Sequence, residues 1–136
     1  MKTLTYETNY GLHAITSDIE SYVKETAVVS GMLCIFCPHT SCSLLLNECV
    51  DGSVQDDLLT WIEKHVPRII ENYTHQYEGD DDMPAHIKTM LTQSSLCIPI
   101  DNGKLVLGTW QGIFLWEHRT MQHNRKIHLK ILSDTV

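Results

Sequence analysis

The order of strand and helix patterns most constrains how this chain can fold. Strand patterns open the chain at residues 2–8 and 11–16, helix patterns dominate its middle, and strand patterns fill its last third. Parallel strands need a long crossover between them, usually a helix, whereas antiparallel neighbours are joined by tight turns. This order predicts a compact α+β fold with mainly antiparallel strands and two to three helices. At this length, one domain spanning residues 1–136 is expected.

Three segments carry helix signals. Ser17 and Glu20 match a capping box and predict a helix over about residues 18–27. Ser53 begins the longest predicted helix, which carries one apolar stripe and ends at a proline. A shorter helix is expected over about residues 83–92, with a proline in its first turn.

Strands and one long loop account for the rest of the chain. Further strands are expected at residues 32–37, 44–48, 96–100, 104–107, 111–117 and 125–132. Asn102-Gly103 predicts a hairpin turn. The polar stretch over residues 71–82 is expected to be a loop, and loops this long in a small domain are usually functional.

Net charge and the absence of long apolar runs exclude several classes of partner. The net charge of −7 argues against nucleic-acid binding and against adhesion to an anionic membrane. No apolar stretch approaches the length of a membrane span, and the first residues lack the apolar core of a signal peptide. We therefore expect a cytoplasmic protein with no nucleic-acid or membrane partner.

The cysteines are expected to be reduced. Their number, five, is odd, which fits free thiols better than a disulfide framework. Cys34 and Cys37 match a CxxC spacing, but they fall on an apolar strand, where residues three apart point to opposite faces. A redox CxxC normally opens a helix. We interpret both as buried core thiols.

The first of three polar segments follows the strand predicted at residues 32–37. His39 stands beside Thr40 and Ser41, and Asn47 and Glu48 end the next strand. A histidine beside hydroxyls at a strand end could bind phosphate or place a proton, and the alternative is a plain surface turn.

The second polar segment runs from His75 to Lys88. His75, Asp82 and His86 could converge on a divalent metal, because imidazole and carboxylate suit zinc or manganese. The alternative is that Asp82 simply caps the following helix. Lys88 lies two residues beyond His86, about 200° around a helix, so both cannot face one site. Lys88 either serves a neighbouring subunit's site or has a structural role.

The third polar segment ends an otherwise apolar strand. Glu117 closes that strand, and a buried carboxylate needs a partner, for which Arg125 on the next strand is the candidate. The alternative to a functional role is a structural salt bridge. Gln111 lies six residues before Glu117, about 20 Å on a straight strand, too far for both to touch one small ligand.

Together the three segments resemble the motifs of the YjbQ family. His39-Thr40-Ser41 with Leu46-Asn47-Glu48 resembles the first motif, the run from Tyr73 and His75 to Lys88 the second, and Gly108-Thr109-Trp110-Gln111-Gly112 with Glu117-His118-Arg119 and Arg125 the third. Cys42 and Thr92-Gln93 depart from the family pattern and put the loop after the His86 helix in question. The resemblance covers about residues 4–132.

The resemblance implies an α+β homotrimer with sites near subunit boundaries and a thiamine-phosphate synthase activity that is considered secondary. That reaction joins hydroxymethylpyrimidine diphosphate to hydroxyethylthiazole phosphate and releases pyrophosphate. The residues assigned are His39, His86, Glu48 and Glu117 for catalysis, Thr40, Ser41, Asn47, Lys88, Gln111 and Arg125 for substrate binding, and His39, His75, Asp82 and His86 for a metal (zinc, magnesium or manganese).

Two other functions stay open from the sequence. One is a metal-dependent hydrolase that uses His39, His75 and His86 as ligands, with Glu48 or Glu117 as the base. The other is a non-enzymatic trimer that binds a small phosphorylated metabolite. We expect the three histidines to share one pocket, because neither the packing stripes nor the helix caps require any of them.

Overall fold

Two antiparallel sheets and three α-helices make up the computed structural model, which describes residues 1–134. This confirms the predicted α+β class. The strands are β1 Lys2–Thr8, β2 Gly11–Ala14, β3 Gly31–Phe36, β4 Cys42–Glu48, β5 Ser95–Asp101, β6 Lys104–Leu105, β7 Gln111–Glu117 and β8 His123–Ser133. The helices are α1 Thr16–Thr26, α2 Gly52–His65 and α3 Asp82–Leu91, with a 3₁₀ turn, η1, at Ile70–Asn72. Among these residues, no helix has the length and apolar character needed to cross a bilayer.

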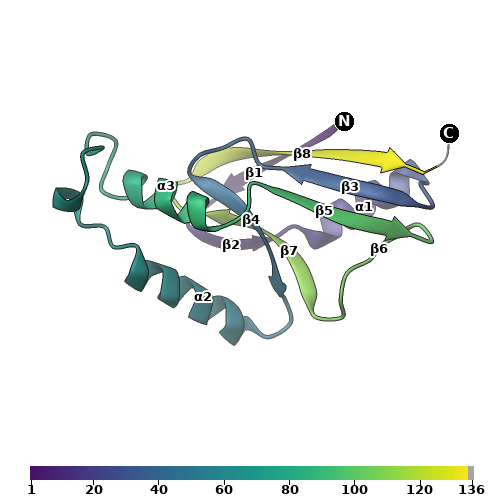
Figure 1. Cartoon of the computed structure of the whole chain (residues 1–136), viewed down its shortest axis with the longest axis horizontal. Helices are drawn as coiled ribbons and strands as arrows, with labels where there is room; N and C mark the ends of the chain where they lie inside the picture. The colour runs from purple at the N-terminus through teal and green to yellow at the C-terminus, as the bar shows by residue number, and fades with distance from the viewer. Residues whose placement is uncertain (135–136) are drawn as a thin grey trace.

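The larger sheet has the strand order β1-β8-β3-β5-β6, and the smaller sheet the order β2-β7-β4. Figure 1 shows α1 behind the larger sheet, where its buried Ile19 and Val23 join the main core. Leu33 of β3 and Ile127 of β8 supply that core from the sheet. In β7, every residue after Gln111 is buried, so the smaller sheet is covered on both faces at its centre.

Helices α2 and α3 lie together at one end of the molecule (Figure 1). Ile62 and Val66 from the α2 region and Trp116 of β7 form a second, smaller core there. The connection between the two helices forms the end opposite the last residues of β8 (Figure 1). This connection contains η1 and the expected long loop.

The predicted capping box at the start of α1 is wrong. The helix begins at Thr16 after Ile15, and no side chain caps it. The start is fixed instead by β7, because the Ile15 amide donates to the Ile113 carbonyl and the Ile113 amide donates to Thr16 Oγ1, each at 2.9 Å. Tertiary hydrogen bonds therefore outweighed the local Ser17–Glu20 pattern.

The starts of the other two helices also differ from expectation. Helix α2 begins at Gly52, one residue before the predicted start at Ser53, and Asp51 caps it by accepting from the Ser53 amide at 2.9 Å. Asp81 occupies the N-cap position of α3, and Asp82 is the first helical residue. The Asp82 carboxylate is therefore not used on its own helix end and can face the loop.

The hairpin and the thiols largely follow expectation. Asn102 and Gly103 both have positive φ, 50° and 74°, which fits a type I′ turn between β5 and β6.

All cysteines in residues 1–134 are free. Cys37 is buried, but Cys34 is only partly buried and faces Cys97 across the strand pair, so the buried-thiol prediction held for Cys37 alone.

Candidate metal centre

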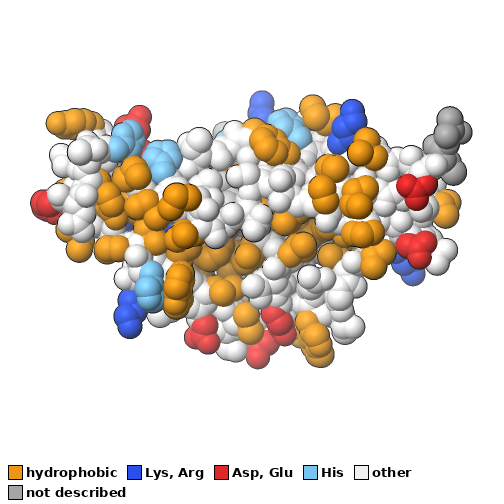
Figure 2. Space-filling model, in the orientation of Figure 1, with side chains coloured by type: hydrophobic (Ala, Val, Ile, Leu, Met, Phe, Trp, Pro, Cys, Tyr) orange, Lys and Arg blue, Asp and Glu red, His pale blue; other side chains and the backbone are white. Residues whose placement is uncertain are grey.

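Three side chains converge at the start of α3. His75 Nε2 lies 2.7 Å from Asp82 Oδ2, and His86 Nε2 lies 3.1 Å from the same oxygen. One ligand atom from each residue lies within 4.8 Å of the other two. Figure 2 shows histidine and acidic side chains gathered at this end of the surface. The structure therefore brings together three of the four residues expected to bind a metal.

Local geometry explains why these three meet. Asp82 and His86 are four residues apart on α3, so they share one helix face. His75 comes from the preceding loop, which turns back at Gly79, where φ is 103°. A residue with a Cβ would be strained at that φ, so glycine suits this turn. The spacing in the sequence therefore places the loop histidine over the first turn of the helix.

The hydrogen bonds of His86 point to a cation between its ring and Asp82. His86 Nδ1 lies 2.8 Å from the Thr40 carbonyl oxygen, which can only accept, so Nδ1 carries a proton. In the neutral ring, Nε2 then presents a lone pair to a carboxylate oxygen 3.1 Å away. Two acceptors at this distance repel each other unless a proton or a metal ion lies between them.

The histidines and Arg119 around Asp82 favour the negatively charged form of its carboxylate. The hydrogen bond that His75 donates to Asp82 is the main cause that raises the pKa of His75, and burial partly opposes it. Burial tends to raise the pKa of Asp82, but the His75 hydrogen bond and the charges of His86 and Arg119 hold that pKa below its ordinary value. Asp82 is therefore an anion at neutral pH, ready to bind a cation.

The donor set fits a divalent transition metal. Ligand atoms about 2.1 Å from a metal lie roughly 3.0–3.4 Å apart at tetrahedral or octahedral angles. The 3.1 Å between His86 Nε2 and Asp82 Oδ2 lies in this range, whereas the 2.7 Å between His75 Nε2 and Asp82 Oδ2 is a hydrogen-bond distance. Metal-binding histidines usually donate their second N–H to a carbonyl or carboxylate, as His86 does to Thr40. Two imidazoles suit zinc better than magnesium, which prefers oxygen ligands.

His39 does not join this group within the described residues. Its Nε2 accepts a hydrogen bond from the Lys126 amide at 2.9 Å, on the larger sheet. Burial and, secondarily, the nearby Arg125 charge lower the pKa of His39, so the ring is neutral at pH 7. The structure therefore brings two of the three predicted pocket histidines together and uses the third to bind the backbone of β8.

Glu117 and Arg125 form a buried pair away from solvent. Arg125 Nε donates to Glu117 Oε1 at 2.7 Å, and its Nη2 donates to Oε2 at 2.6 Å. The same Nη2 donates to Ser41 Oγ at 2.9 Å, and Thr8 Oγ1 donates to Glu117 Oε1 at 2.7 Å. This geometry matches the structural salt bridge that the sequence left open, rather than an accessible base or phosphate site.

Three other predicted site residues satisfy backbone groups nearby in the chain. Glu48 Oε2 accepts from the amides of Val50 and Asp51, at 2.7 and 2.8 Å. Asn47 Oδ1 accepts from the Glu48 amide, and Gln111 Oε1 from the Gly108 amide, each at 2.8 Å. Each carbonyl or carboxylate oxygen therefore shapes a turn.

Lys88 is buried, with 1% of its surface exposed, and its Nζ lies 2.5 Å from Glu63 Oε1 of α2. Its ammonium also lies 5.1 Å from the centre of the Tyr10 ring. The expected divergence from His86 around the helix places Lys88 in the α2–α3 interface, and its acid partner comes from its own chain. This favours the structural alternative for Lys88.

Two residues near the site were not assigned from the sequence. Arg119 donates to Asp82 Oδ1 at 2.8 Å, and His118 is buried with its Nε2 2.8 Å from Ser43 Oγ. Both stand in the third motif, directly after Glu117. Their position in that motif was the available signal, but sequence alone could not show that the turn after β7 meets α3.

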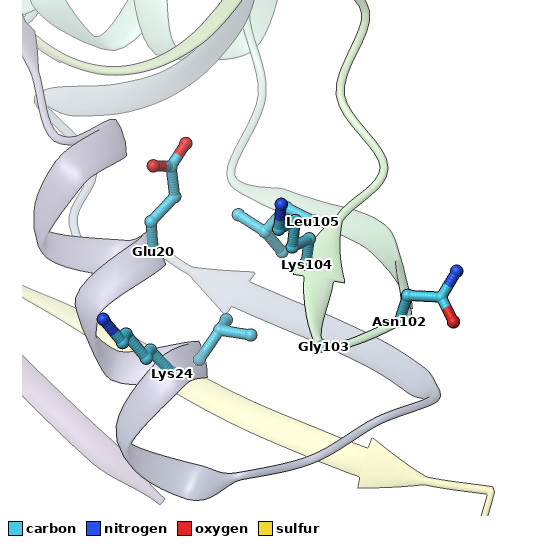
Figure 3. A pocket seen from close by; sticks show the side chains of 7 residues that line it. Glu20, Lys24, Asn102, Gly103, Lys104 and Leu105 are labelled. Carbon is cyan, nitrogen blue, oxygen red and sulfur yellow. The ribbon is translucent and has the colours of Figure 1, made fainter.

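A separate pocket lies away from these residues. This pocket of about 520 Å³ lies between α1 and the β5–β6 hairpin and contains none of the predicted site residues. Figure 3 shows the Lys24 amine and the Asn102 amide pointing away from each other. Its polar groups do not converge, so the candidate site stays at α3.

Fold and site together define a small antiparallel α+β protein with a two-histidine, one-carboxylate group at the start of a helix. A family model described as UPF0047 protein YjbQ-like matches residues 2–134, and the chain belongs to this family. This confirms the resemblance drawn from the three motifs.

Individual relatives and a solved structure support the same family assignment. The UPF0047 protein of Synechocystis is 47% identical over 123 residues, 90% of this chain and 84% of that protein. YjbQ of Escherichia coli O157:H7 is 41% identical over 128 residues, 93% and 92% of the two chains. A YjbQ/UPF0047 family protein from Clostridium acetobutylicum superposes with a TM-score of 0.88 at 37% identity, covering 97% of this chain and 100% of its own.

Proposed function

We propose that this protein is a metal-dependent transferase of the thiamine-phosphate synthase type, whether or not that activity is its main role. In this reaction, the thiazole nitrogen attacks the methylene carbon of the pyrimidine, a C–N bond forms, and the C–O bond to diphosphate breaks. The bonding electrons leave with pyrophosphate, so the developing negative charge on the leaving group must be stabilised. The family resemblance implies the reaction, and a metal ion bound at the site would stabilise that charge.

The observation that carries the proposal is the convergence of His75, Asp82 and His86. Three protein ligands leave coordination positions open for a substrate oxygen, as in catalytic rather than structural zinc sites. A divalent metal bound here would act as a Lewis acid toward the diphosphate oxygens. Zinc or manganese fits the donor set better than magnesium.

The chain's own residues have distinct tasks in this proposal. Asp82 supplies a negative ligand, and the Thr40 carbonyl holds the His86 ring with Nε2 directed at the centre. His39 accepts from the Lys126 amide through Nε2, which leaves its proton on Nδ1. In this proposal, that Nδ1–H donates to a phosphate oxygen of the substrate, although His39 itself lies outside the metal group.

An activity assay tests the proposal. Protein stripped with a chelator and reloaded with zinc, manganese or magnesium is incubated with the two heterocyclic phosphates, and thiamine phosphate is measured. Replacing His86 by Ala is expected to abolish turnover with little loss of stability. His128→Ala serves as a matched control, because His128 contacts Thr3 and lies outside the group. Turnover that persists in the His86 variant, or that needs no metal in the wild type, would contradict the proposal.

A metal-dependent hydrolase is the second candidate, favoured by one observation. Glu78 Oε2 lies 2.9 Å from His75 Nε2, and its side chain is 65% exposed, so an accessible carboxylate stands beside the metal group. Glu48 and Glu117, the bases expected from the sequence, are held by backbone amides or by Arg125 instead. Pyrophosphate released from the diphosphate substrate in the absence of the thiazole would favour hydrolysis over transfer. Ligand binding without turnover would favour the non-enzymatic hypothesis.

We also propose a homotrimer, as the family resemblance implies, and a cytoplasmic location, as the expectation from the sequence has it. Exposed apolar side chains support self-association, since large apolar patches on small proteins usually mark contact surfaces. Met32 and Leu132 are paired across β3 and β8 and are 37% and 56% exposed. Trp110, just before β7, is 59% exposed. Light scattering that showed a stable monomer at micromolar concentration would contradict the trimer.

A further inference from the structure

The guanidinium group of Arg119 is shared among three acceptors at the edge of the candidate metal centre. Its Nε donates to Asp81 Oδ2 at 3.0 Å, its Nη1 to Asp82 Oδ1 at 2.8 Å, and its Nη2 to the Glu78 carbonyl oxygen at 2.9 Å. All three acceptors belong to the loop and first turn that carry the metal group. One planar side chain therefore fixes the segment from residue 78 to residue 82.

The two oxygens of Asp82 have separate partners. Oδ1 accepts from Arg119, while Oδ2 faces both His75 and His86. A carboxylate held through one oxygen presents the other in a fixed direction, as a monodentate ligand. Without Arg119, the carboxylate could rotate, and Oδ1 and Oδ2 would both compete for protons and water.

Arg119 is itself held from the other side. Its amide donates to Glu117 Oε2 at 3.2 Å, and Glu117 is buried in its pair with Arg125. Hydrogen bonds thus run from Arg125 on β8 through Glu117 to the Arg119 backbone amide, and separately from the Arg119 guanidinium to Asp82. They connect the buried sheet to the surface site.

We propose that Arg119 is a positioning residue that orients Asp82 as a metal ligand. This inference rests on the proposed metal centre. Partners that orient metal ligands typically contribute 10- to 100-fold in metal affinity. Lysine cannot replace arginine here, because its single nitrogen cannot reach three acceptors with the geometry of a planar fork.

A structural role for Arg119 is the alternative, because it also ties the turn after β7 to α3. Asp81 provides the matched control for that role. Asp81 accepts from Arg119 Nε and from the Thr120 amide at 2.8 Å, but it is outside the metal group. Replacing Asp81 by Asn weakens the same loop attachment and leaves the Arg119–Asp82 hydrogen bond in place.

The experiment measures cobalt(II) and zinc(II) binding to the full chain, with cobalt absorption reporting coordination geometry and thermal unfolding reporting the fold. We expect Arg119→Lys to bind 10- to 100-fold more weakly, with an altered cobalt spectrum, and Asp81→Asn to change affinity by less than about threefold. Added guanidinium is expected to restore part of the affinity of Arg119→Ala.

The outcomes separate the two proposals. Wild-type affinity and spectrum in Arg119→Lys would overturn the role of Arg119 and leave the metal centre standing. Equal affinity losses in Arg119→Lys and Asp81→Asn, in step with equal losses of thermal stability, would overturn it in favour of a structural role. Absence of binding by the wild type would overturn the metal centre itself, and the role of Arg119 with it.

Discussion

At the scale of single residues, His118 shows how a buried polar group couples the fold to pH. It is 1% exposed, its Nε2 contacts Ser43, and its Nδ1 has no partner within the described residues. Burial, followed by the charges of Lys88 and Arg125, lowers the pKa of His118 to about 3. The neutral ring is therefore part of the folded state.

We predict that acidification destabilises the protein through His118. Between pH 6.5 and about 3, the unfolded chain binds a proton at this residue and the folded chain does not. The free energy of unfolding must then fall as pH falls through this window. From pH 7 to pH 5 the loss is expected to be about 2 kcal/mol.

Urea unfolding of the wild type and of His118→Gln at the two pH values checks this prediction. Glutamine keeps an amide that can contact Ser43 but does not titrate, so its acid-induced loss should be smaller. His128→Gln controls for replacement of a histidine elsewhere. Identical acid-induced losses in the wild type and His118→Gln would show that His118 is not the group responsible.

The residue scale also shows what the sequence could predict. The spacing of His75, Asp82 and His86 was enough to propose a shared metal, because a loop residue and two residues on one helix face have few ways to be arranged. His39 could not be excluded from the sequence, because its partner, the Lys126 amide, lies 87 residues away. Arg119 was missed for the same reason, since its contacts with Asp81 and Asp82 are long-range.

At the scale of elements, the attachment of α2 to α3 depends on few contacts. Lys88 of α3 pairs with Glu63 of α2, and the Tyr10 hydroxyl donates to the same carboxylate. Around them, Ile62 and Ile87 contribute to a small apolar cluster. The ion pair, in which Lys88 is buried and the Glu63 side chain is 33% exposed, therefore acts together with this cluster to fix α2 against α3.

We predict that Lys88→Met lowers the free energy of unfolding by about 1–3 kcal/mol, because it leaves the Glu63 carboxylate with only the more distant Arg68, 3.6 Å away, as a cation partner. Adding Glu63→Gln should recover part of this loss, since the double variant removes the weakly compensated charge. Denaturant unfolding measures both effects. A stable Lys88→Met variant with weakened binding of phosphorylated substrate would instead restore the substrate-binding role first assigned to Lys88.

Element boundaries were predictable only where local chemistry decided them. The Asn102-Gly103 turn followed from its sequence, because both residues tolerate the positive φ that the hairpin requires. The start of α1 did not, because hydrogen bonds to Ile113 on β7 moved it ahead of Ser17. Tertiary contacts of this kind cannot be detected in a local sequence pattern.

At the scale of the whole molecule, the two sheets hold in place the segments that contact the candidate site, and the site itself lies at the start of α3, outside the sheets. Strands β7 and β8 place Glu117 and Arg125 against Ser41, and the turn between these strands delivers Arg119 to α3. The α+β class followed from the order of patterns along the chain. The strand order β1-β8-β3-β5-β6 did not, because it depends on pairing between distant segments.

The central claim is that His75, Asp82 and His86 bind one divalent metal per chain. Equilibrium dialysis of purified protein against zinc, followed by elemental analysis, tests it most directly. We predict about one zinc per wild-type chain, close to none for Asp82→Asn and for His86→Ala, and a wild-type amount for His128→Ala. A wild-type protein that retains no stoichiometric zinc or manganese, or variants that retain as much as the wild type, would contradict the account.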